Sequence, residues 1–216
     1  MAAYREYRTR GGSERGRAVP YRRRSALARL GPGMTDRSPP TDPVLVLVTG
    51  LPGTGKSTVA EAIAGRLAAP VLAHDWAMSG LRPYDEMQVV LDRMEPSGHR
   101  VVGWSILNAL ARLQLRRGRS VVLDGVARQP EILGCRKAAN SEGAALVVVA
   151  THCSDADIHR SRVVGRRRDI PDWYEVDWSH VERSRASWEA PGQVDLSLDA
   201  VDSWAENLAH LEILFG

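Results

Sequence analysis

The sequence lacks an apolar stretch long enough to cross a membrane, because its longest apolar runs fall far short of the roughly 20 residues that a spanning helix needs. Its first residues also lack the apolar segment of a secretory signal peptide. Only two cysteines are present, Cys135 and Cys153, and they form no CxxC pair. We therefore expect a soluble cytoplasmic protein with two buried, reduced thiols.

Phenylalanine is nearly absent, with one residue against six tryptophans, but the rest of the composition is that of a globular domain. Of the 216 residues, 44% are hydrophobic and 25% are charged. A chain of this length can form one domain with a substantial core.

Positive charge is concentrated in the first 33 residues. They hold nine of the 29 basic residues and two of the 26 acidic ones, so the remaining chain has 20 basic and 24 acidic residues. This acidic remainder weakens the case for nucleic-acid binding. The stretch 1–43 has few apolar residues and is predicted to be a disordered, arginine-rich leader. Three explanations compete for this leader. It can be a basic tail that contacts nucleic acid or another anion, or a segment that resembles a transit peptide. We favour the third, in which the protein starts at Met34 and the residues before it come from a start codon assigned too early.

From residue 44 onward, apolar strands alternate with amphipathic helices. We expect strands at 44–49, 70–75, 120–125, 145–153 and 193–199. Helices are expected at 56–68, 85–94, 99–117, 130–142, from 154 or 155 towards 166, and at 202–214. This alternation is typical of a parallel sheet covered on both faces, so residues 44–216 are predicted to form one three-layer α/β domain with about five parallel strands.

A glycine-rich segment lies between the first strand and the first helix. Residues 50–57, GLPGTGKS, fit the P-loop pattern G-x-x-x-x-G-K-[ST]. Glycines let backbone N–H groups approach a phosphate closely, and the following helix adds free N–H groups and a positive dipole end. Lys56 is expected to reach the β- and γ-phosphates, and Ser57 to ligate Mg²⁺. The predicted nucleotide-binding residues are Gly50, Gly53, Thr54, Gly55, Lys56, Ser57 and Thr58.

Two aspartates follow strands at the edge of the sheet where the P-loop is expected. Asp124 closes the third strand, where a carboxylate can orient Mg²⁺. Asp75 closes the second strand and can accept the proton of an attacking hydroxyl, with His74 as a weaker alternative base. Either aspartate can instead be a helix cap or turn residue.

Two absent motifs narrow the class of nucleotide-binding protein. The sequence has no N/T-K-x-D motif of guanine-specific GTPases, which favours ATP. Asp124 is followed by Gly125 instead of a water-activating glutamate, which disfavours a hydrolytic AAA+ motor.

Arginines cluster in the segment 159–178, HRSRVVGRRRDIPDWYEVDW. Arg162 and Arg166 are four residues apart, so we expect them on one helix face, where their guanidinium groups suit phosphate oxygens. A small lid over about 162–178 would close over ATP and exclude water. The alternative is a solvated basic helix end that favours the helix dipole.

Taken together, these motifs resemble the P-loop kinases of the nucleoside-monophosphate-kinase type. The run Arg162-Val-Val-Gly-Arg166-Arg167 is similar to the lid-entry motif of adenylate kinases, which implies that Arg162 stacks near adenine and Arg166 contacts phosphates. The wider layout resembles the small AAA-type ATP-binding kinases, which include polynucleotide kinases, zeta toxins and chloramphenicol phosphotransferase. That resemblance implies that Asp75 is the general base.

The acceptor side is expected in a helical insertion over 76–117, which covers the acceptor pocket in this architecture. The candidate acceptor residues are Asp75, Arg82 and Arg128, followed by Trp76, Tyr84, Asp85, His99 and Trp104. The tryptophans at 173, 178 and 188 are expected to pack the base of the lid rather than bind the acceptor.

The sequence therefore predicts an ATP- and Mg²⁺-dependent kinase that phosphorylates a hydroxyl of a small molecule, as a monomer or dimer without membrane contact. Its expected catalytic residues are Lys56, Asp75 and Arg166, with Ser57 and Asp124 at the metal. A polynucleotide 5′-hydroxyl kinase is a less favoured alternative, because the body of the chain is acidic. An ATP-binding regulatory module with slow hydrolysis is the third hypothesis.

Overall fold

A computed structural model describes residues 42–94, 97–189 and 191–215. The leader predicted over 1–43, with its alternative start at Met34, lies outside the described residues apart from positions 42 and 43. Within the described ranges, none of the helices combines the length and apolar character that crossing a membrane requires.

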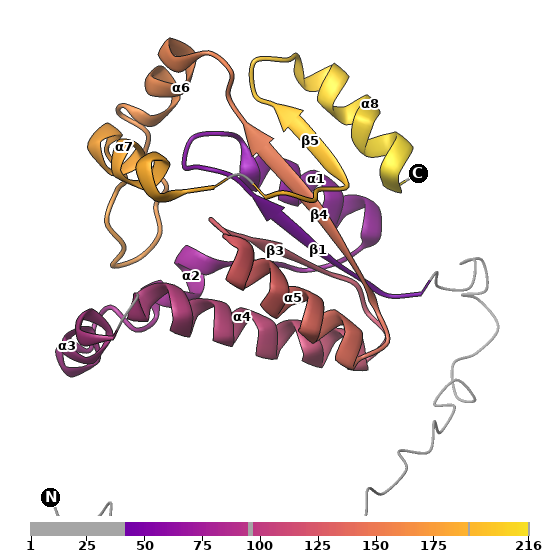
Figure 1. The fold of residues 1–216 in the computed structure, drawn as a ribbon, viewed down its shortest axis with the longest axis horizontal. Coiled ribbons are helices and arrows are strands. Elements are labelled where there is room, and N and C mark those ends of the chain that lie inside the picture. Colours follow the sequence, from indigo (N-terminus) through magenta and orange to yellow (C-terminus); the bar gives the residue numbers. More distant parts are fainter. Residues whose placement is uncertain (1–41, 95–96, 190, 216) are drawn as a thin grey trace, which may run out of the picture. The chain divides into compact units, whose positions relative to one another are not determined.

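The described residues from 42 onward form a single parallel β-sheet with the strand order β2-β3-β1-β4-β5 (Figure 1). The strands are β1 (Val44–Thr49), β2 (Val71–Ala73), β3 (Val121–Asp124), β4 (Ala145–His152) and β5 (Leu196–Asp199). This sheet confirms the predicted α/β fold with five parallel strands.

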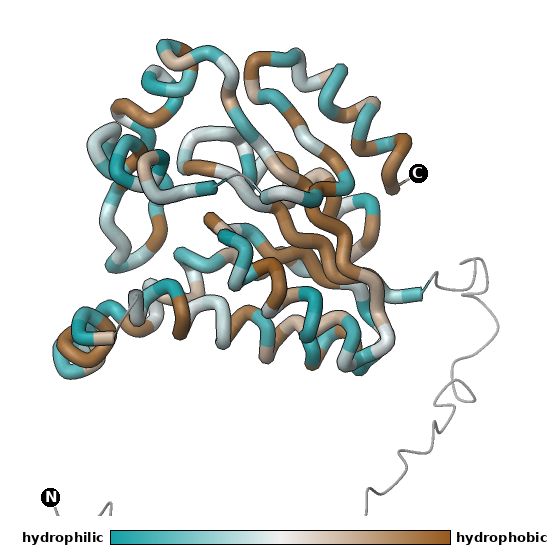
Figure 2. Tube along the Cα trace, viewed as in Figure 1, coloured by the Kyte–Doolittle hydropathy of each residue, from teal (hydrophilic) through white to brown (hydrophobic). Residues whose placement is uncertain are grey.

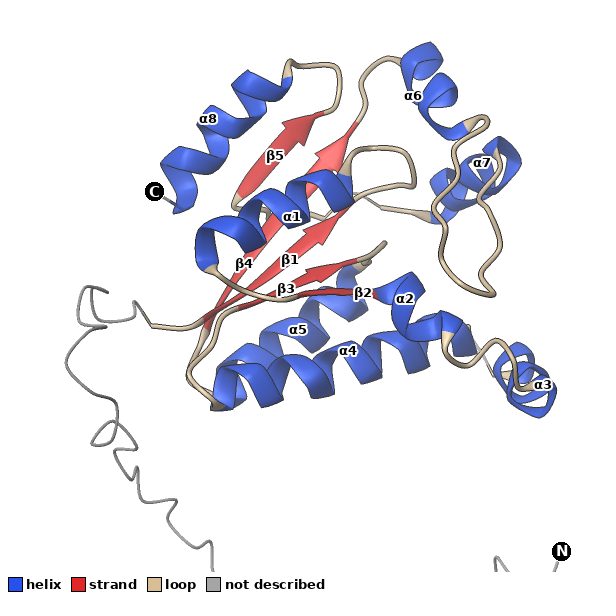
Figure 3. Cartoon of the chain, turned by 180° about the vertical axis from the view of Figure 1, so that it is seen from behind, coloured by secondary structure: helices blue, strands red, loops and turns tan. Residues whose placement is uncertain are grey.

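Helices cover both faces of the sheet (Figures 1 and 3). One face carries α1 (Lys56–Leu67) and α8 (Trp204–Phe215), and the other carries α4 (Gly98–Arg116) and α5 (Gln129–Ser141). The short helices α2 (His74–Ser79) and α3 (Asp85–Arg93) lead from β2 to α4. Beyond the carboxyl end of β4 lie α6 (Ala156–Val163) and α7 (Trp178–Ser187), as Figure 1 shows.

The central strand β1 supplies both hydrophobic cores, because successive side chains of a strand point to opposite faces. Leu45 and Leu47 belong to the core under α4 and α5, whereas Val46 and Val48 belong to the core under α1 and α8. All four are fully buried, and the hydropathy colouring of Figure 2 shows the apolar middle layer. Burial on both faces explains why this strand is an unbroken apolar run.

The two cysteines are both free thiols. Cys135 is buried in the core beneath α4 and α5, as predicted, whereas Cys153 is partly exposed after β4. The expectation that both thiols are buried is therefore wrong for Cys153.

Two predicted boundaries are also wrong. The strand expected over 70–75 ends at Ala73, because its partner strand ends at Asp124, opposite Ala73, and the pairing cannot continue. Asp75 consequently lies in the first turn of α2 instead of in the strand. The helix expected to reach residue 166 ends at Val163, and Gly165 follows with a φ of 74°. Arg162 and Arg166 therefore do not share a helix face.

Candidate nucleotide and acceptor site

The loop after β1 has the shape of a phosphate cradle, and the end of β4 supports it. Gly50 has a φ of 151°, and a Cβ added there would lie 2.2 Å from the carbonyl oxygen of Thr151, so only glycine fits. The buried Thr54 hydroxyl donates to the carbonyl of Leu51 at 2.8 Å and lies 2.7 Å from the Thr151 hydroxyl. These contacts fix the path of the loop before α1 begins.

A buried histidine of α6 attaches the same loop to α7. His159 Nε2 lies 2.7 Å from the carbonyl oxygen of Pro52, and its Nδ1 lies 2.9 Å from Arg185 Nη2. A guanidinium group can only donate hydrogen bonds, so Nδ1 accepts, Nε2 carries the proton, and Nε2 donates to Pro52. Burial lowers the pKa of His159, which favours this neutral form. Sequence reasoning missed this contact, since a single histidine on a helix has no distinguishing pattern.

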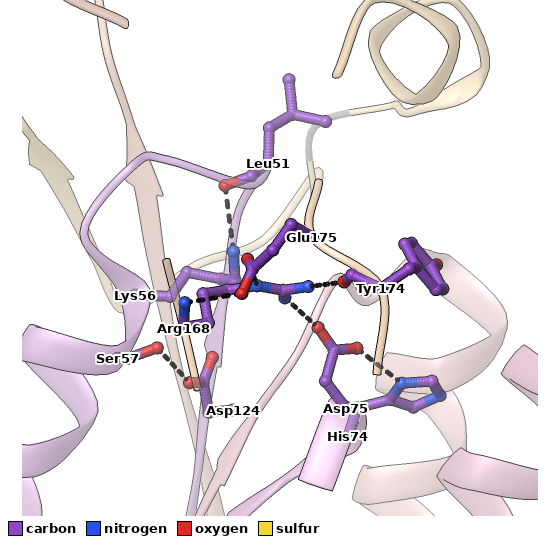
Figure 4. A network of polar contacts seen from close by, with 9 residues as sticks. All are labelled: Leu51, Lys56, Ser57, His74, Asp75, Asp124, Arg168, Tyr174 and Glu175. Carbon is purple, nitrogen blue, oxygen red and sulfur yellow. Dashed lines mark hydrogen bonds and ion pairs between the residues drawn. The ribbon is translucent and has the colours of Figure 1, made fainter. Parts of the chain in front are cut away.

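Lys56 begins α1 and turns its ammonium back onto the loop. Its Nζ donates to the carbonyl of Leu51 at 2.9 Å (Figure 4). Burial lowers the pKa of Lys56, an effect that the charges of Asp124 and Asp75 oppose. Lys56 is partly buried and lines the same cavity as the rest of the P-loop.

The next residue, Ser57, contacts Asp124, the aspartate that was predicted to lie at the same metal ion. Ser57 Oγ donates to Asp124 Oδ2 at 2.8 Å, across the contact between α1 and β3. Burial raises the pKa of Asp124, while the nearby Lys56 charge opposes that rise. A hydroxyl and a carboxylate oxygen side by side are the donor types that Mg²⁺ prefers, so this pair fits the metal that accompanies ATP.

On the other side of the cavity, Asp75 forms an ion pair with Arg168. Arg168 Nη1 lies 2.5 Å from Asp75 Oδ2, and His74 Nδ1 lies 3.4 Å from Oδ1 (Figure 4). Burial alone would raise the pKa of Asp75, but the His74 hydrogen bond and the Arg168 charge outweigh it and lower the pKa to about 2. Asp75 is thus a carboxylate at any physiological pH.

Arg168 also holds together the loop that it belongs to. We call residues 164–177, between α6 and α7, the lid loop. Within it, Arg168 Nη2 donates to the carbonyl of Tyr174 at 2.7 Å, and the Arg168 backbone N–H donates to Glu175 Oε1 at 2.9 Å. The sequence predicted an arginine-rich lid but selected Arg162 and Arg166. It did not single out Arg168, because the acidic partner on α2 lies 93 positions away.

These groups border one cavity of about 800 Å³. Of the predicted site residues, its lining includes Gly53, Gly55, Lys56, Ser57, Thr58, Asp75, Asp124, Arg162 and Arg166, joined by Arg167 and Arg168. Gly50 and Thr54 lie behind the lining as supports of the loop.

Several acceptor candidates lie elsewhere. Arg82 and Arg128 do not line the cavity. Arg82 donates to Gln88 Oε1 at 3.1 Å, and Arg128 donates to the Ser187 hydroxyl at 3.1 Å. Their roles toward an acceptor stay predictions without support from the cavity lining. Trp104 is buried in the core, and Trp76 is the one tryptophan in the lining of this cavity among the residues that the structure describes.

Comparison with known proteins shows the family of this chain. Residues 45–191 match the family model described as an AAA domain, AAA_33. The chain belongs to this family. The uncharacterized protein Rv2004c of Mycobacterium tuberculosis is 30% identical over 158 residues, which cover 70% of this chain and 31% of that relative. The chain thus spans less than a third of the length of the curated relatives that it matches.

Solved structures of small kinases share the fold of this family member. A sugar kinase from Janibacter sp. HTCC2649 has a TM-score of 0.57 at 17% identity, covering 80% of this chain and 94% of that one. The APS kinase CysC of Mycobacterium tuberculosis, in complex with AMPPNP and APS, has a TM-score of 0.57 at 22% identity, covering 81% and 98%. The chain therefore has the α/β fold of P-loop kinases, as its sequence predicted.

Proposed function

We propose that this chain is an ATP-dependent kinase that transfers the γ-phosphoryl group of ATP to a hydroxyl of a small-molecule acceptor. The observation that carries the proposal is the shared cavity. Lys56 and the Ser57–Asp124 pair border it on the P-loop side, and the Asp75 carboxylate borders it from α2 (Figure 4). An ionised carboxylate in the same cavity as the P-loop can accept the proton of an attacking hydroxyl.

The chain's own residues divide the binding of ATP among them. Lys56 exchanges its bond to Leu51 for the β- and γ-phosphates, and Arg162 and Arg166 supply further positive charge from α6 and the lid loop. Ser57 and Asp124 would hold Mg²⁺, which when bound neutralises part of the phosphate charge.

In the transfer step, the acceptor oxygen attacks the γ-phosphorus in line. A new phosphorus–oxygen bond forms to the acceptor, and the bond from the γ-phosphorus to the bridging oxygen of ADP breaks. Asp75 accepts a hydrogen bond from the attacking hydroxyl and takes its proton as the transfer proceeds. A carboxylate with a pKa of about 2 is a weak base, which suits a reaction that depends mainly on positioning and charge stabilisation.

The decisive experiment compares Asp75→Asn with the unchanged chain in a screen for transfer of labelled γ-phosphate. The acceptors are sugars, nucleosides, aminoglycosides, phenols and 5′-hydroxyl oligonucleotides. Asp75→Asn should lower transfer by about 10²–10⁴-fold and leave the Kd for ATP unchanged, because the carboxylate does not hold the nucleotide. The matched control is Asp85→Asn, which removes an exposed carboxylate outside the cavity lining.

Other outcomes point to the two other hypotheses. Full transfer by Asp75→Asn would reject its role in the reaction. Hydrolysis of ATP without transfer to any acceptor would support a regulatory module, and transfer to oligonucleotides alone would support a polynucleotide kinase. Lys56→Ala, which removes the P-loop ammonium, should abolish transfer in every case.

A further inference from the structure

One ion pair joins the lid loop to the body of the domain. Among the hydrogen bonds of the residues that the structure describes, the bond from Arg168 to Asp75 is the only one that connects the lid loop to a residue outside α6 and α7. The other hydrogen bonds of the loop lie within it or at its junctions with these two helices. The polar attachment of the lid loop therefore ends on the carboxylate that is proposed to be the base (Figure 4).

The shape of the lid loop determines where the Arg168 guanidinium lies. Its Nη2 donates to the carbonyl of Tyr174 at 2.7 Å, and its Nε lies 3.4 Å from Glu175 Oε2. Between these partners the chain turns back through Asp169 and Asp172, which have left-handed φ values of 51° and 55°. Few residues other than glycine adopt such values, so the surrounding contacts must hold the turn. If the turn opens, Arg168 loses its supports and moves away from its partner on α2.

Asp75 depends on this contact for its orientation. Arg168 holds Oδ2 from the lid loop, whereas His74 Nδ1, on the same helix as Asp75, lies 3.4 Å from Oδ1. The second distance is long for a hydrogen bond, so the guanidinium group is the stronger constraint. Each carboxylate oxygen has two lone pairs and can still accept a hydrogen bond from an incoming hydroxyl. Arg168 thus fixes the carboxylate without using all of its capacity as an acceptor.

The charge of Arg168 also compensates the charge of the carboxylate. Asp75 and the phosphates of ATP would be anions in one cavity, and like charges repel in partly buried surroundings. Arg168 lines the same cavity. Burial and, to a smaller extent, the charge of Arg168 lower the pKa of Lys56, so this guanidinium lies near the ammonium that is expected at the phosphates. A positive charge near both groups reduces the repulsion between them.

We infer that Arg168 is a positioning residue, which holds Asp75 in the orientation for phosphoryl transfer only while the lid loop keeps its contact with α2. This inference rests on the proposed kinase function and adds a regulation of the same site. When the lid loop opens to admit or release nucleotide, water enters the cavity and Asp75 loses its fixed orientation. The base is therefore in place only in the closed form, which favours transfer to the acceptor over loss of the phosphoryl group to bulk water.

The first test determines whether Asp75 holds the lid loop. Arg166 and Arg167 are exposed in the loop, so trypsin can cleave after them when the loop opens. The full chain is incubated with trypsin at pH 7.5 without nucleotide, and mass spectrometry follows cleavage at these two positions. Asp75→Asn should accelerate this cleavage by about fivefold, because it weakens a partly exposed ion pair. Asp85→Asn, which removes an exposed carboxylate outside the cavity lining, should leave the rate unchanged.

The second test determines whether Arg168 acts through Asp75. The reaction is the release of labelled phosphate from ATP, in which a water molecule takes the place of the acceptor hydroxyl, so no identified acceptor is needed. Arg168→Met should lower the rate by about 10–10²-fold, and Arg168→Lys, which keeps the charge, should restore part of it. The double variant Arg168→Met/Asp75→Asn should match Asp75→Asn alone within about twofold, because no base is left to position.

The matched control is Arg167→Met, which removes the neighbouring arginine of the lid loop from the lining of the same cavity. Any loss that it causes should multiply with the loss in Asp75→Asn, as expected of residues that act independently. The same multiplication in the Arg168→Met/Asp75→Asn variant would overturn the inference, since Arg168 would then act on the nucleotide itself.

The outcomes separate this inference from the kinase proposal. Faster cleavage in Asp75→Asn together with non-additive losses in hydrolysis would support the role of Arg168, even if the screen finds no acceptor and transfer to a hydroxyl is rejected. Conversely, a substrate from the screen combined with equal cleavage in Asp75→Asn and Asp85→Asn would retain the kinase and reject the role of Arg168. Hydrolysis that Asp75→Asn leaves unchanged would also overturn the inference, because Asp75 would then not act as a base.

Discussion

At the scale of single residues, His159 joins three parts of the site. It donates to Pro52 in the P-loop, accepts from Arg185 on α7 and itself belongs to α6. Trp178, also on α7, packs its ring edge-on at 5.3 Å from the imidazole centroid. Any change in the charge of His159 therefore affects both the P-loop and α7.

His159→Leu should lower the free energy of unfolding by about 1–3 kcal/mol at pH 7.5, because the Pro52 carbonyl loses its donor and the Arg185 guanidinium loses one acceptor. The pKa of His159 is lowered in the folded protein, so its contribution is complete above the unfolded value of about 6.5 and declines as the pH falls below it. The difference between the two proteins in urea unfolding should accordingly shrink from pH 7.5 to pH 5.5. His210→Leu, an exposed histidine on α8, is the control, and an unchanged difference across this range would contradict the lowered pKa of His159 in the folded protein.

Arg168→Met should raise the pKa of Asp75 above about 2, because the neighbouring positive charge is lost while the carboxylate stays partly buried. The pKa of Asp75 is depressed in the folded state, so the ion pair stabilises the protein above about pH 4 and loses its effect towards pH 2. At pH 7 the loss should be about 1 kcal/mol, a modest value since a third of the Asp75 side chain is solvated.

The measurement for Arg168→Met is urea unfolding at pH 7.0, 4.5 and 3.0, with Arg160→Met, an exposed arginine of α6, as the control. A destabilisation that does not decrease towards pH 3.0 would show that Arg168 acts through packing instead of through the charge of Asp75.

At the scale of helices, two glycines that lie within helices differ in the space around their Cα atoms. Gly65 is exposed in α1, and a Cβ added there meets nothing within 4 Å. Gly103 is buried in α4, and a Cβ added there would lie 2.3 Å from His74 Nε2 and 2.9 Å from Met78 Cγ. Gly103 therefore makes room for the side chain that hydrogen-bonds to Asp75.

The pair Gly65→Ala and Gly103→Ala separates these effects. Gly65→Ala should stabilise the protein by about 0.5–1 kcal/mol through helix propensity alone. Gly103→Ala should destabilise it by about 1–3 kcal/mol through overpacking, and should also lower phosphoryl transfer by displacing His74. Thermal unfolding and the transfer assay check both variants. Stabilisation by Gly103→Ala with unchanged transfer would show that the α2–α4 contact does not position Asp75.

The elements themselves were largely predictable, and the contacts between distant elements were not. The apolar run of β1 and the GLPGTGKS loop can be recognised from a few consecutive residues, because one is a continuous hydrophobic stretch and the other a known motif. The proximity of Ser57 and Asp124 could also be predicted, because the carboxyl ends of parallel strands lie at one edge of a sheet. The Asp75–Arg168 pair and the Arg128–Ser187 bond join residues that have no pattern in common, so only folding brings them together.

At the scale of the whole molecule, the sheet and the family match both begin after the basic leader. The first strand starts at Val44 and the match to the AAA domain covers 45–191. A variant that lacks residues 1–33 should therefore retain its Tm within about 2 °C and its Kd for ATP within about twofold, because no part of the sheet is removed. Thermal unfolding and ATP titration measure this, and a loss of folding would give the leader a structural role.

The strand order also determines when this chain can fold during synthesis. β1 is made first, yet its two neighbours in the sheet are β3 and β4, which are made much later. On the ribosome, the most apolar strand of the protein has no partner until residues 121–124 have emerged, and only one until 145–152 follow. Parallel pairings of such long sequence separation form slowly, so the nascent chain exposes Leu45 to Val48 at least until β3 and β4 have been made. This interval is the period in which a chaperone would benefit the protein most.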